Sequence, residues 1–214
     1  MRALFPDGVP HPWLKPGVFI GSLAPIPVMI WRGTHGQLGA DVVATVLNQL
    51  GYLALTFLIA SLLCTPLRLV AGWSWGIRLR RMLGLFAFSY ASLHFLTYLV
   101  IDQSLNLRAV VDDIRKRNFI LVGFLALVLL LPLAITSTDR MVRRLGFARW
   151  KRLHRLAYVA GGLGVIHFIW RVKADLREPL IFTSILAGAL ALRILGALRL
   201  RARRKVAPRA GMAG

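Results

Sequence analysis

Apolar residues along the chain fall in long blocks that short, arginine-rich polar segments separate. Each block has about 18–22 residues, the length that a helix needs to cross a hydrocarbon core of about 30 Å. Lipid offers the backbone no hydrogen-bond partners, so each block is predicted to be a helix. The expected spans are 14–31, 46–66, 82–101, 118–136, 153–170 and 179–198. The pattern therefore predicts an all-α integral membrane protein.

The expected architecture is a six-transmembrane-helix bundle over residues 14–198. A short N-terminal segment, 1–13, precedes it and a basic tail, 199–214, comes after it. The block at 14–31 is the weakest of the six because it contains three prolines. The second block is expected to end at Pro66.

The basic residues between the blocks predict the orientation of the bundle. Arginine and lysine are concentrated at 78–81, 140–152 and 199–209, which alternate with segments holding fewer of them. Cytoplasmic loops of membrane proteins carry the excess of these residues. Both termini are therefore predicted to be cytoplasmic, and the protein is expected to cross the membrane several times.

Composition supports a membrane protein over a soluble basic one. The chain is 57% hydrophobic, against about 45–50% for soluble domains. Its formal net charge of +20 would suggest nucleic acid in a soluble protein. Here the charges flank apolar blocks, so lipid and not nucleic acid is the expected partner. The single cysteine, Cys64, excludes an internal disulfide and a cysteine-based metal site within one subunit.

Three of the five histidines lie in predicted spans, where ionisable residues are candidates for function. His154 and His167 share one block, but thirteen residues of helix place them about 20 Å apart along the axis. They cannot bind one metal ion together. His94 and His167 lie near the same ends of two blocks that run in the same direction, so they are expected at similar depth.

Two imidazoles at one depth on neighbouring helices can bind a haem iron from both faces. His94 and His167 are therefore the predicted axial ligands of a haem. The alternative is a neutral imidazole that shares a hydrogen bond with a neighbouring helix. Small residues below them, Gly161, Gly162 and Gly164, either make room for a flat macrocycle or let helices pack closely. Both interpretations of these glycines stay open.

His154 has no such partner, because the matching position on the third block is Arg81. It is expected either to bind a second haem with an unusual or missing partner, or to contact a haem propionate, a flavin or a quinone headgroup. Arginines at that level suit anionic groups through charge-assisted hydrogen bonds. They are Arg80, Arg81, Arg152 and Arg155.

Several stretches of the chain match a family pattern. "RRMLGLFAFSYASLHFLTYL" (80–99), "LAITSTDRMVRRLGFARWKRLHRLAYV" (133–159) and "IHFIWRVKAD" (166–175) are the most specific, and "GQLGAD" (36–41) and "LLCTPLR" (62–68) agree. The chain resembles the haem-binding membrane subunits of the protein-methionine-sulfoxide reductase system, the MsrQ family. That family is similar to the wider ferric-reductase-like transmembrane superfamily.

The resemblance implies a multi-pass b-type cytochrome of a bacterial inner membrane, which would carry electrons from the quinone pool or a cytoplasmic flavin reductase to a periplasmic molybdopterin methionine sulfoxide reductase. It implies one haem b, or two, with the haem histidines at His94, His154 and His167. It also implies FMN, although no local motif here locates a flavin.

The residues themselves limit the chemistry of this chain. It has no G-x-G-x-x-G motif and no large soluble domain, so a nicotinamide site of its own is not expected. The loops are too short to form a site for protein-bound methionine sulfoxide. A different function, a small transporter or channel whose histidines move protons or metal ions, would favour acidic residues beside the histidines inside the spans, and the blocks hold none there.

Overall fold

The computed structural model describes residues 13–72, 75–172 and 175–206, of which 199–206 are described as backbone. This part of the chain is helical throughout its regular structure. The elements are α1 (Leu14–Leu23), α2 (Pro25–Thr34), α3 (Val42–Ala71), α4 (Gly76–Leu96), the π-helical turn η1 (Thr97–Asp102), α5 (Leu107–Lys116), α6 (Asn118–Ile135), α7 (Asp139–Leu145), α8 (Phe147–Leu153), α9 (Leu156–Arg171) and α10 (Arg177–Val206).

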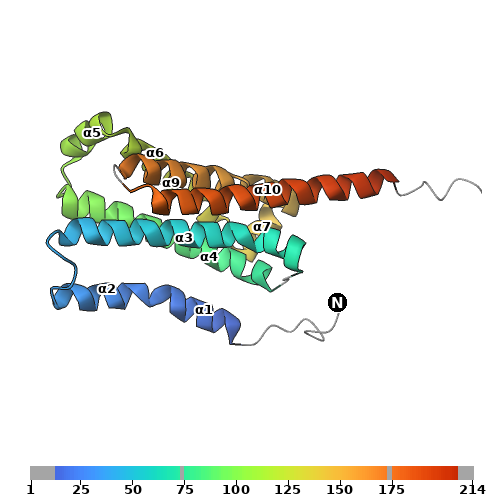
Figure 1. Cartoon of the computed structure of the whole chain (residues 1–214), viewed down its shortest axis with the longest axis horizontal. Coiled ribbons are helices and arrows are strands. Elements are labelled where there is room, and N and C mark those ends of the chain that lie inside the picture. Colours follow the sequence, from blue (N-terminus) through green and yellow to red (C-terminus); the bar gives the residue numbers. More distant parts are fainter. Residues whose placement is uncertain (1–12, 73–74, 173–174, 207–214) are drawn as a thin grey trace, which may run out of the picture.

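The long helices lie roughly side by side along one axis (Figure 1). The closest packing joins α3 to α4 and α6 to α9, and α10 packs against α3 and α9. The α1–α2 segment lies on the far side of α3 and α4 from the other long helices in Figure 1. Its main polar link to the bundle is the Tyr90 hydroxyl of α4, which donates to the Ser22 carbonyl at 2.6 Å.

Five helical stretches are long and apolar enough to cross a membrane by length and composition. They are Leu14–Thr34, Val42–Ala71, Gly76–Asp102, Asn118–Ile135 and Arg177–Leu198. Helix α9 has 16 residues and therefore extends about 24 Å, somewhat less than the thickness of a bilayer core. A membrane helical bundle is shown, whereas the count of six spans and the cytoplasmic termini stay predictions.

Prolines shape the helices differently from the sequence-based expectation. The block at 14–31 forms two helices that meet at Ala24, and Pro25 occupies the first position of α2, where its missing N–H is tolerated. The prediction that the second span ends at Pro66 is wrong. Pro66 lies inside α3, which continues to Ala71 and ends at Gly72 with a φ of 70°. That left-handed conformation favours glycine.

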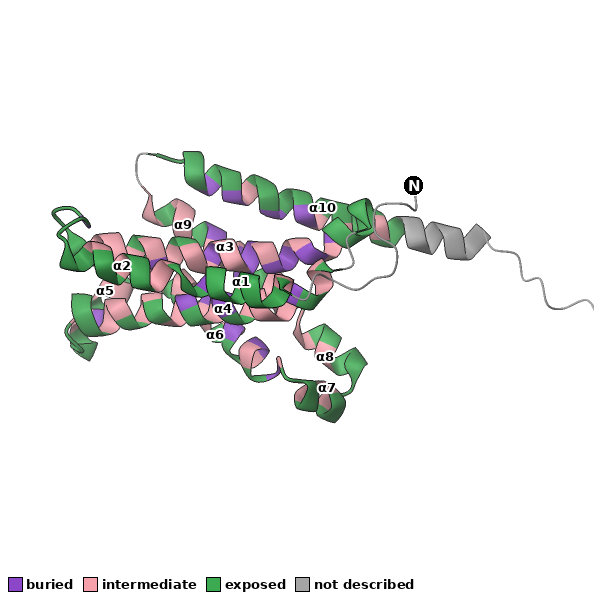
Figure 2. Cartoon of the chain, turned by 90° about the horizontal axis from the view of Figure 1, so that it is seen from below, coloured by how far each residue is buried: buried purple, intermediate pink, exposed green. Residues whose placement is uncertain are grey.

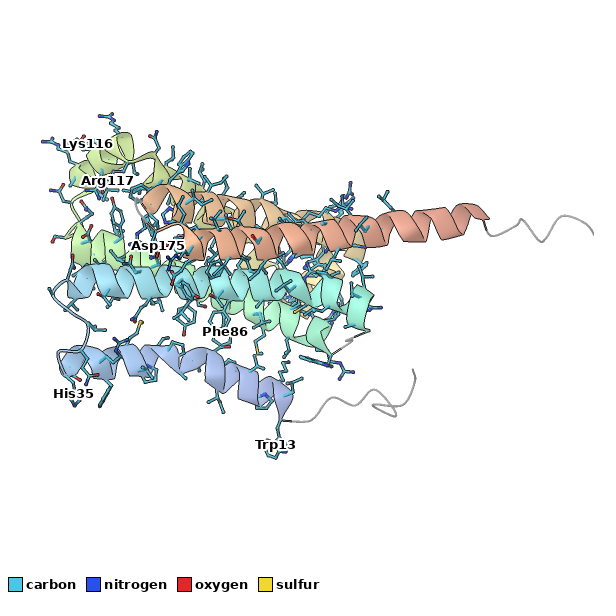
Figure 3. The ribbon with its side chains drawn as sticks, in the orientation of Figure 1. Trp13, His35, Phe86, Lys116, Arg117 and Asp175 are labelled. Carbon is cyan, nitrogen blue, oxygen red and sulfur yellow. The ribbon has the colours of Figure 1, made fainter. Side chains whose placement is uncertain are left out.

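Short helices occupy the segments between the spans, and side-chain caps begin two of them, α5 and α7, as well as the long helix α3. Asp41, Asn106 and Thr138 accept hydrogen bonds from the backbone N–H three residues on, at the starts of α3, α5 and α7. Such caps satisfy backbone donors that a helix start leaves free. Figure 3 shows His35, Lys116, Arg117 and Asp175 toward one end of the bundle and Trp13 at the other.

The core runs along the shared face of the long helices (Figure 2). Its centre is a run on α3, which includes Leu55, Leu58, Ile59 and Leu62, packed against residues of α4, α6, α9 and α10. Many large apolar side chains on the outer faces are exposed, as expected of helices that face lipid tails. The predicted segment 1–13 lies almost entirely outside the described residues, and α10 runs across the predicted start of the basic tail at 199.

Candidate functional site

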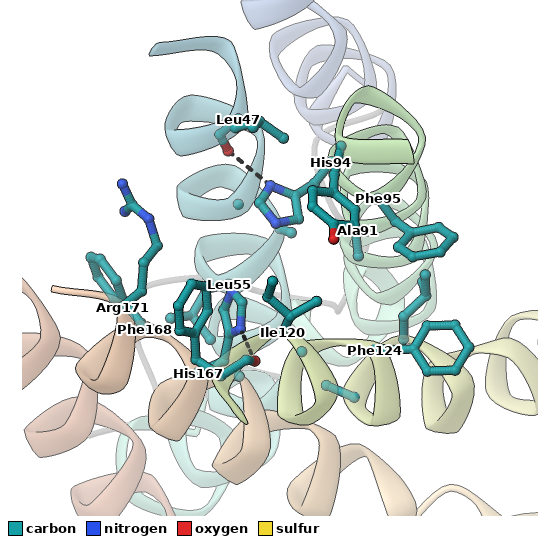
Figure 4. Close-up of a pocket in the computed structure, with 18 of the residues that line it drawn as sticks. Leu47, Leu55, Ala91, His94, Phe95, Ile120, Phe124, His167, Phe168 and Arg171 are labelled. Atoms are coloured by element: carbon teal, nitrogen blue, oxygen red, sulfur yellow. Dashed lines mark hydrogen bonds between the residues drawn. The ribbon is translucent and has the colours of Figure 1, made fainter. Parts of the chain in front are cut away.

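His94 of α4 and His167 of α9 meet inside the bundle, at the end that carries α5. The centroids of their rings are 6.1 Å apart and the ring planes are nearly perpendicular, at 87°. Figure 4 shows both imidazoles in one cavity, reached from different helices. The structure therefore brings together the two histidines for which the sequence predicted equal depth. We call this the paired end of the bundle.

Each of these rings is held by a backbone carbonyl of a neighbouring helix. His94 Nδ1 lies 2.8 Å from the Leu47 carbonyl oxygen, and His167 Nδ1 lies 2.7 Å from that of Phe119. A carbonyl oxygen can only accept, so in each ring Nδ1 carries the proton and donates it. The other nitrogen, Nε2, then keeps its lone pair. This arrangement is typical of histidines that bind a metal, since the carbonyl fixes both tautomer and ring orientation.

Two glycines make room for these rings. A Cβ added at Gly51 of α3 would lie 3.2 Å from Nδ1 and Cε1 of His94. One added at Gly123 of α6 would lie 2.6 Å from Nδ1 of His167, closer than real Cβ atoms approach. The sequence analysis missed both positions. The signal available was an isolated glycine in a helical apolar block, a feature that often has a packing reason.

The two histidines line a cavity of about 350 Å³ formed by α3, α4, α6 and α9. Most of its wall is apolar, with Leu55, Ala91 and Phe95 among the lining residues. Polar and charged groups also line it: Asp41, Asn48, Tyr52, Tyr98, Asp102, Arg117 and Arg171. Cavities of about 300–1,000 Å³ with few polar groups are typical of sites for small molecules and cofactors.

The pair also has the spacing for a shared metal ion. Imidazole nitrogens bind metals at about 2.0–2.1 Å, so two rings on opposite sides of one ion have centroids about 6 Å apart. The observed centroid separation of 6.1 Å matches that requirement. Two Nε2 atoms that keep their lone pairs, this separation of the rings and an apolar cavity thus fit axial ligation of a haem iron.

Comparison with known proteins agrees with this geometry. The family described as ferric reductase like transmembrane component matches residues 50–165. Three relatives carry the name protein-methionine-sulfoxide reductase heme-binding subunit MsrQ. The one from Rhodospirillum rubrum is 50% identical over 187 residues, which cover 86% of this chain and 88% of the relative. Those from Deinococcus radiodurans and Herminiimonas arsenicoxydans are 48% and 45% identical, covering 84% and 89% of this chain and 88% of each relative.

The chain belongs to the MsrQ family. The resemblance inferred from the sequence motifs is therefore confirmed. Membership and the apolar helices together identify a multi-pass membrane protein. The matched segment 50–165 includes His94 and His154 and stops just before His167, while the MsrQ relatives align over most of the chain.

His154 lies at the opposite end of this MsrQ chain, between α8 and α9. Its Nε2 is 3.1 Å from the Thr136 hydroxyl, and its ring stacks on Trp150 with centroids 4.1 Å apart. The same hydroxyl donates to the Pro132 carbonyl at 2.6 Å, so toward His154 it accepts. His154 therefore carries its proton on Nε2, and the atom that most often binds haem iron is engaged. We call this the single end.

The four arginines predicted beside His154 differ in their surroundings. Arg80 reaches the Thr65 hydroxyl at 3.4 Å, and Arg81 binds the Ser137 carbonyl at 2.7 Å and the Asp139 carboxylate at 2.5 Å. Arg81 holds the pKa of Asp139 below its usual range. Arg152 and Arg155 are exposed. Arg80 and Arg81 thus have protein partners, and the other two face outward.

The glycines between His154 and His167 were expected either to make room for a macrocycle or to let helices pack closely, and the structure separates them. A Cβ at Gly161 would lie 3.2 Å from Leu62 and near Leu186, so this position serves close packing against α3 and α10. Gly164 lines the cavity and also approaches Leu55 at 3.2 Å. Gly162 has no neighbour within 4 Å. Gly161 therefore serves packing between helices. Of these three glycines, only Gly164 borders the cavity.

Proposed function

We propose that this chain holds a haem b between His94 and His167 and works as the electron-transfer subunit of a methionine sulfoxide reductase system. Electrons would enter from the quinone pool or a cytoplasmic flavin reductase. They would leave to a periplasmic molybdopterin enzyme that repairs oxidised envelope proteins. The observation that carries the proposal is the pair of facing imidazoles, 6.1 Å apart, each with Nε2 free. The MsrQ relatives, named as heme-binding subunits, support it.

The residues of the chain divide the work of holding the cofactor. Bound haem supplies a one-electron redox centre. The carbonyls of Leu47 and Phe119 keep both imidazoles in the tautomer that can bind iron. Gly51 and Gly123 allow the rings to lie against α3 and α6. The apolar wall excludes water, which influences the redox potential of a buried iron.

The single end is the proposed side of electron entry. His154, Arg80, Arg81, Arg152 and Arg155 would contact the headgroup of a quinone, an FMN, a propionate or a second haem there. The bond from His154 Nε2 to Thr136 favours a headgroup contact over iron ligation, because ligation through Nε2 would break that bond. The ratio of haem to protein, measured in the wild type and in His154→Ala, separates these roles. A fall from two haems to one would establish iron ligation.

We place the protein in a bacterial inner membrane with the single end toward the cytoplasm. The concentration of arginine at 140–152, beside that end, supports this orientation. Reporter fusions after residues 36 and 145 test it. A periplasmic reporter active at 36 and inactive at 145 is the expected result, and the reverse would overturn the orientation.

A reduced-minus-oxidised visible spectrum of the detergent-purified protein tests the haem assignment. The expected result is a b-type signal in the wild type that His94→Ala and His167→Ala each abolish. His35→Ala is the matched control, because His35 is exposed and bonds only to Trp31 and Thr34 beside it. A wild type purified from haem-replete cells without a b-type signal would refute the proposal.

The electron route has its own test. The purified protein, reduced by a quinol, is mixed with the periplasmic reductase and methionine sulfoxide. Reoxidation of the signal that depends on both additions is expected. Reoxidation by methionine sulfoxide alone would place a substrate site in this chain and contradict the proposed division of labour.

A further inference from the structure

Arg171 ends α9 one helical turn beyond His167. A residue four positions on lies on the same face of a helix, about 6 Å farther along the axis. Arg171 accordingly lines the same cavity as the two histidines. Figure 4 shows its side chain extending from α9 beside Phe168, to one side of the two imidazoles. A cation thus borders the apolar cavity on the side of the histidine pair.

This cation has no counter-ion in the described part of the chain. No carboxylate pairs with Arg171, and no hydrogen bond satisfies its guanidinium there. The other arginine of the cavity, Arg117, differs: its Nε lies 2.9 Å from Asp113, which also accepts from the Tyr98 hydroxyl at 3.1 Å. A partly buried guanidinium without a partner is unfavourable unless an anion joins it. Arg171 is therefore the cavity arginine that is available for a ligand.

A second hollow adjoins the cavity at Arg171. It has a volume of about 640 Å³ and lies between α2, α3, the end of α9 and the start of α10. Asn48, Tyr52, Phe168 and Arg171 line both spaces. Arg171 thus stands where the apolar cavity opens into a more polar groove, which also holds Glu178. We call this the outer groove.

We propose that Arg171 binds a propionate of the haem and so directs the propionate edge toward the outer groove. The inference rests on the proposed haem between His94 and His167. Haem is apolar except for two carboxylates on one edge, and these need either water or a cation. A guanidinium can grip a carboxylate with two parallel N–H···O bonds. The arginines near His154, which the sequence analysis considered for propionates, lie at the other end of the bundle.

The experiment compares haem with its dimethyl ester, which has the same ring and no carboxylates. The full chain is stripped of haem, reconstituted with either compound, and assayed for transfer of the ring to apomyoglobin. In the wild type, haem should be released about tenfold to a hundredfold more slowly than the ester, as expected for a hydrogen-bonded ion pair. In Arg171→Gln that difference should vanish, and in Arg171→Lys it should be partly kept. The bis-histidine spectrum should persist in both variants.

Arg177→Gln is the matched control, because Arg177 is exposed and lines neither space. This variant should release haem more slowly than the ester, by the same factor as the wild type. If Arg171→Gln also distinguishes them as the wild type does, the propionates are held elsewhere and the inference is overturned. If the wild type binds neither compound, the proposed function itself fails, which is a different result.

Discussion

The paired end and the single end of the bundle use the same side chain in opposite ways. At the paired end, His94 and His167 donate from Nδ1 to carbonyls of neighbouring helices, which leaves both Nε2 atoms free. At the single end, His154 engages Nε2 with Thr136 and stacks on Trp150. The presence of a histidine in an apolar segment therefore does not by itself make it a metal ligand. Which nitrogen its neighbours occupy decides whether it can bind a metal.

The surroundings differ as well. Glycine backs both rings at the paired end, so the helices leave space that the imidazoles and a cofactor can share. At the single end, an indole and a hydroxyl contact the ring, which is partly exposed. The first region is built around a cavity, and in the second the ring is held by two side chains. Substitutions should therefore have their largest effects at the paired end.

The largest effect is expected from Gly123→Ala. The new methyl carbon would lie 2.6 Å from His167 Nδ1, which forces the ring or α6 to move. Such overpacking costs about 1–3 kcal/mol, so haem content at limiting haem should fall roughly tenfold or more. The measurement is the haem-to-protein ratio of the purified variant. Gly162→Ala, with nothing within 4 Å, is the control and should keep full haem. Equal haem content in the two variants would show that the position of the His167 ring does not affect haem binding.

A smaller effect is expected from Gly51→Ala. Its methyl carbon would lie 3.2 Å from the His94 ring, a contact that a shift of a few tenths of an ångström relieves. Haem should be retained, but the tilt of the His94 ring should change the low-spin electron paramagnetic resonance spectrum and the midpoint potential. An unaltered spectrum and potential would show that α3 does not constrain His94.

At the single end, Thr136→Val tests the bond that engages His154. The variant loses the contact to Nε2 and a bond to the Pro132 carbonyl, each worth about 1 kcal/mol. Thr183→Val is matched, since Thr183 makes the same bond to the carbonyl four residues before it, that of Pro179, and no other. Thr136→Val should melt about 2–4 °C lower than Thr183→Val, in detergent, with the b-type signal unchanged. Equal melting temperatures would mean that the His154 bond contributes nothing.

The smallest effect is expected from Asp139→Asn, which breaks the exposed ion pair with Arg81. Arg81 lowers the pKa of Asp139 below the ordinary 3.8, so the pair stabilises the folded state above that value and the contribution is lost as pH falls through the lowered pKa. Melting of the wild type should therefore fall slightly more steeply than that of the variant below about pH 4. Asp112→Asn, at a longer exposed pair, should match the wild type. A steeper fall in the Asp139 variant would reverse the sign and refute the assignment.

The pairing of His94 and His167 could be predicted from the sequence because depth in a membrane depends on position along a span. The direction in which each helix face points, around the helix axis, cannot be predicted in that way. Gly51 and Gly123 back the rings only because α3 and α6 turn those faces inward, which depends on packing between helices. For the same reason the engagement of His154 by Thr136 and Trp150 could not be predicted from the sequence. The prediction at Pro66 was wrong because a proline near a helix end can be accommodated inside the packed α3.

Helix α4 is followed by a wider turn, η1, which begins three residues after His94. A π-helical turn holds one residue more than the α-helical turn it replaces. The extra residue lies beyond His94 and leaves the register of that histidine unchanged, and Tyr98 of this turn donates to Asp113 of α5. Loss of one residue from 97–102 would rotate the chain beyond the deletion by about 100° and separate Tyr98 from Asp113. An insertion or deletion in this turn would therefore move the loop and α5 while leaving His94 in place.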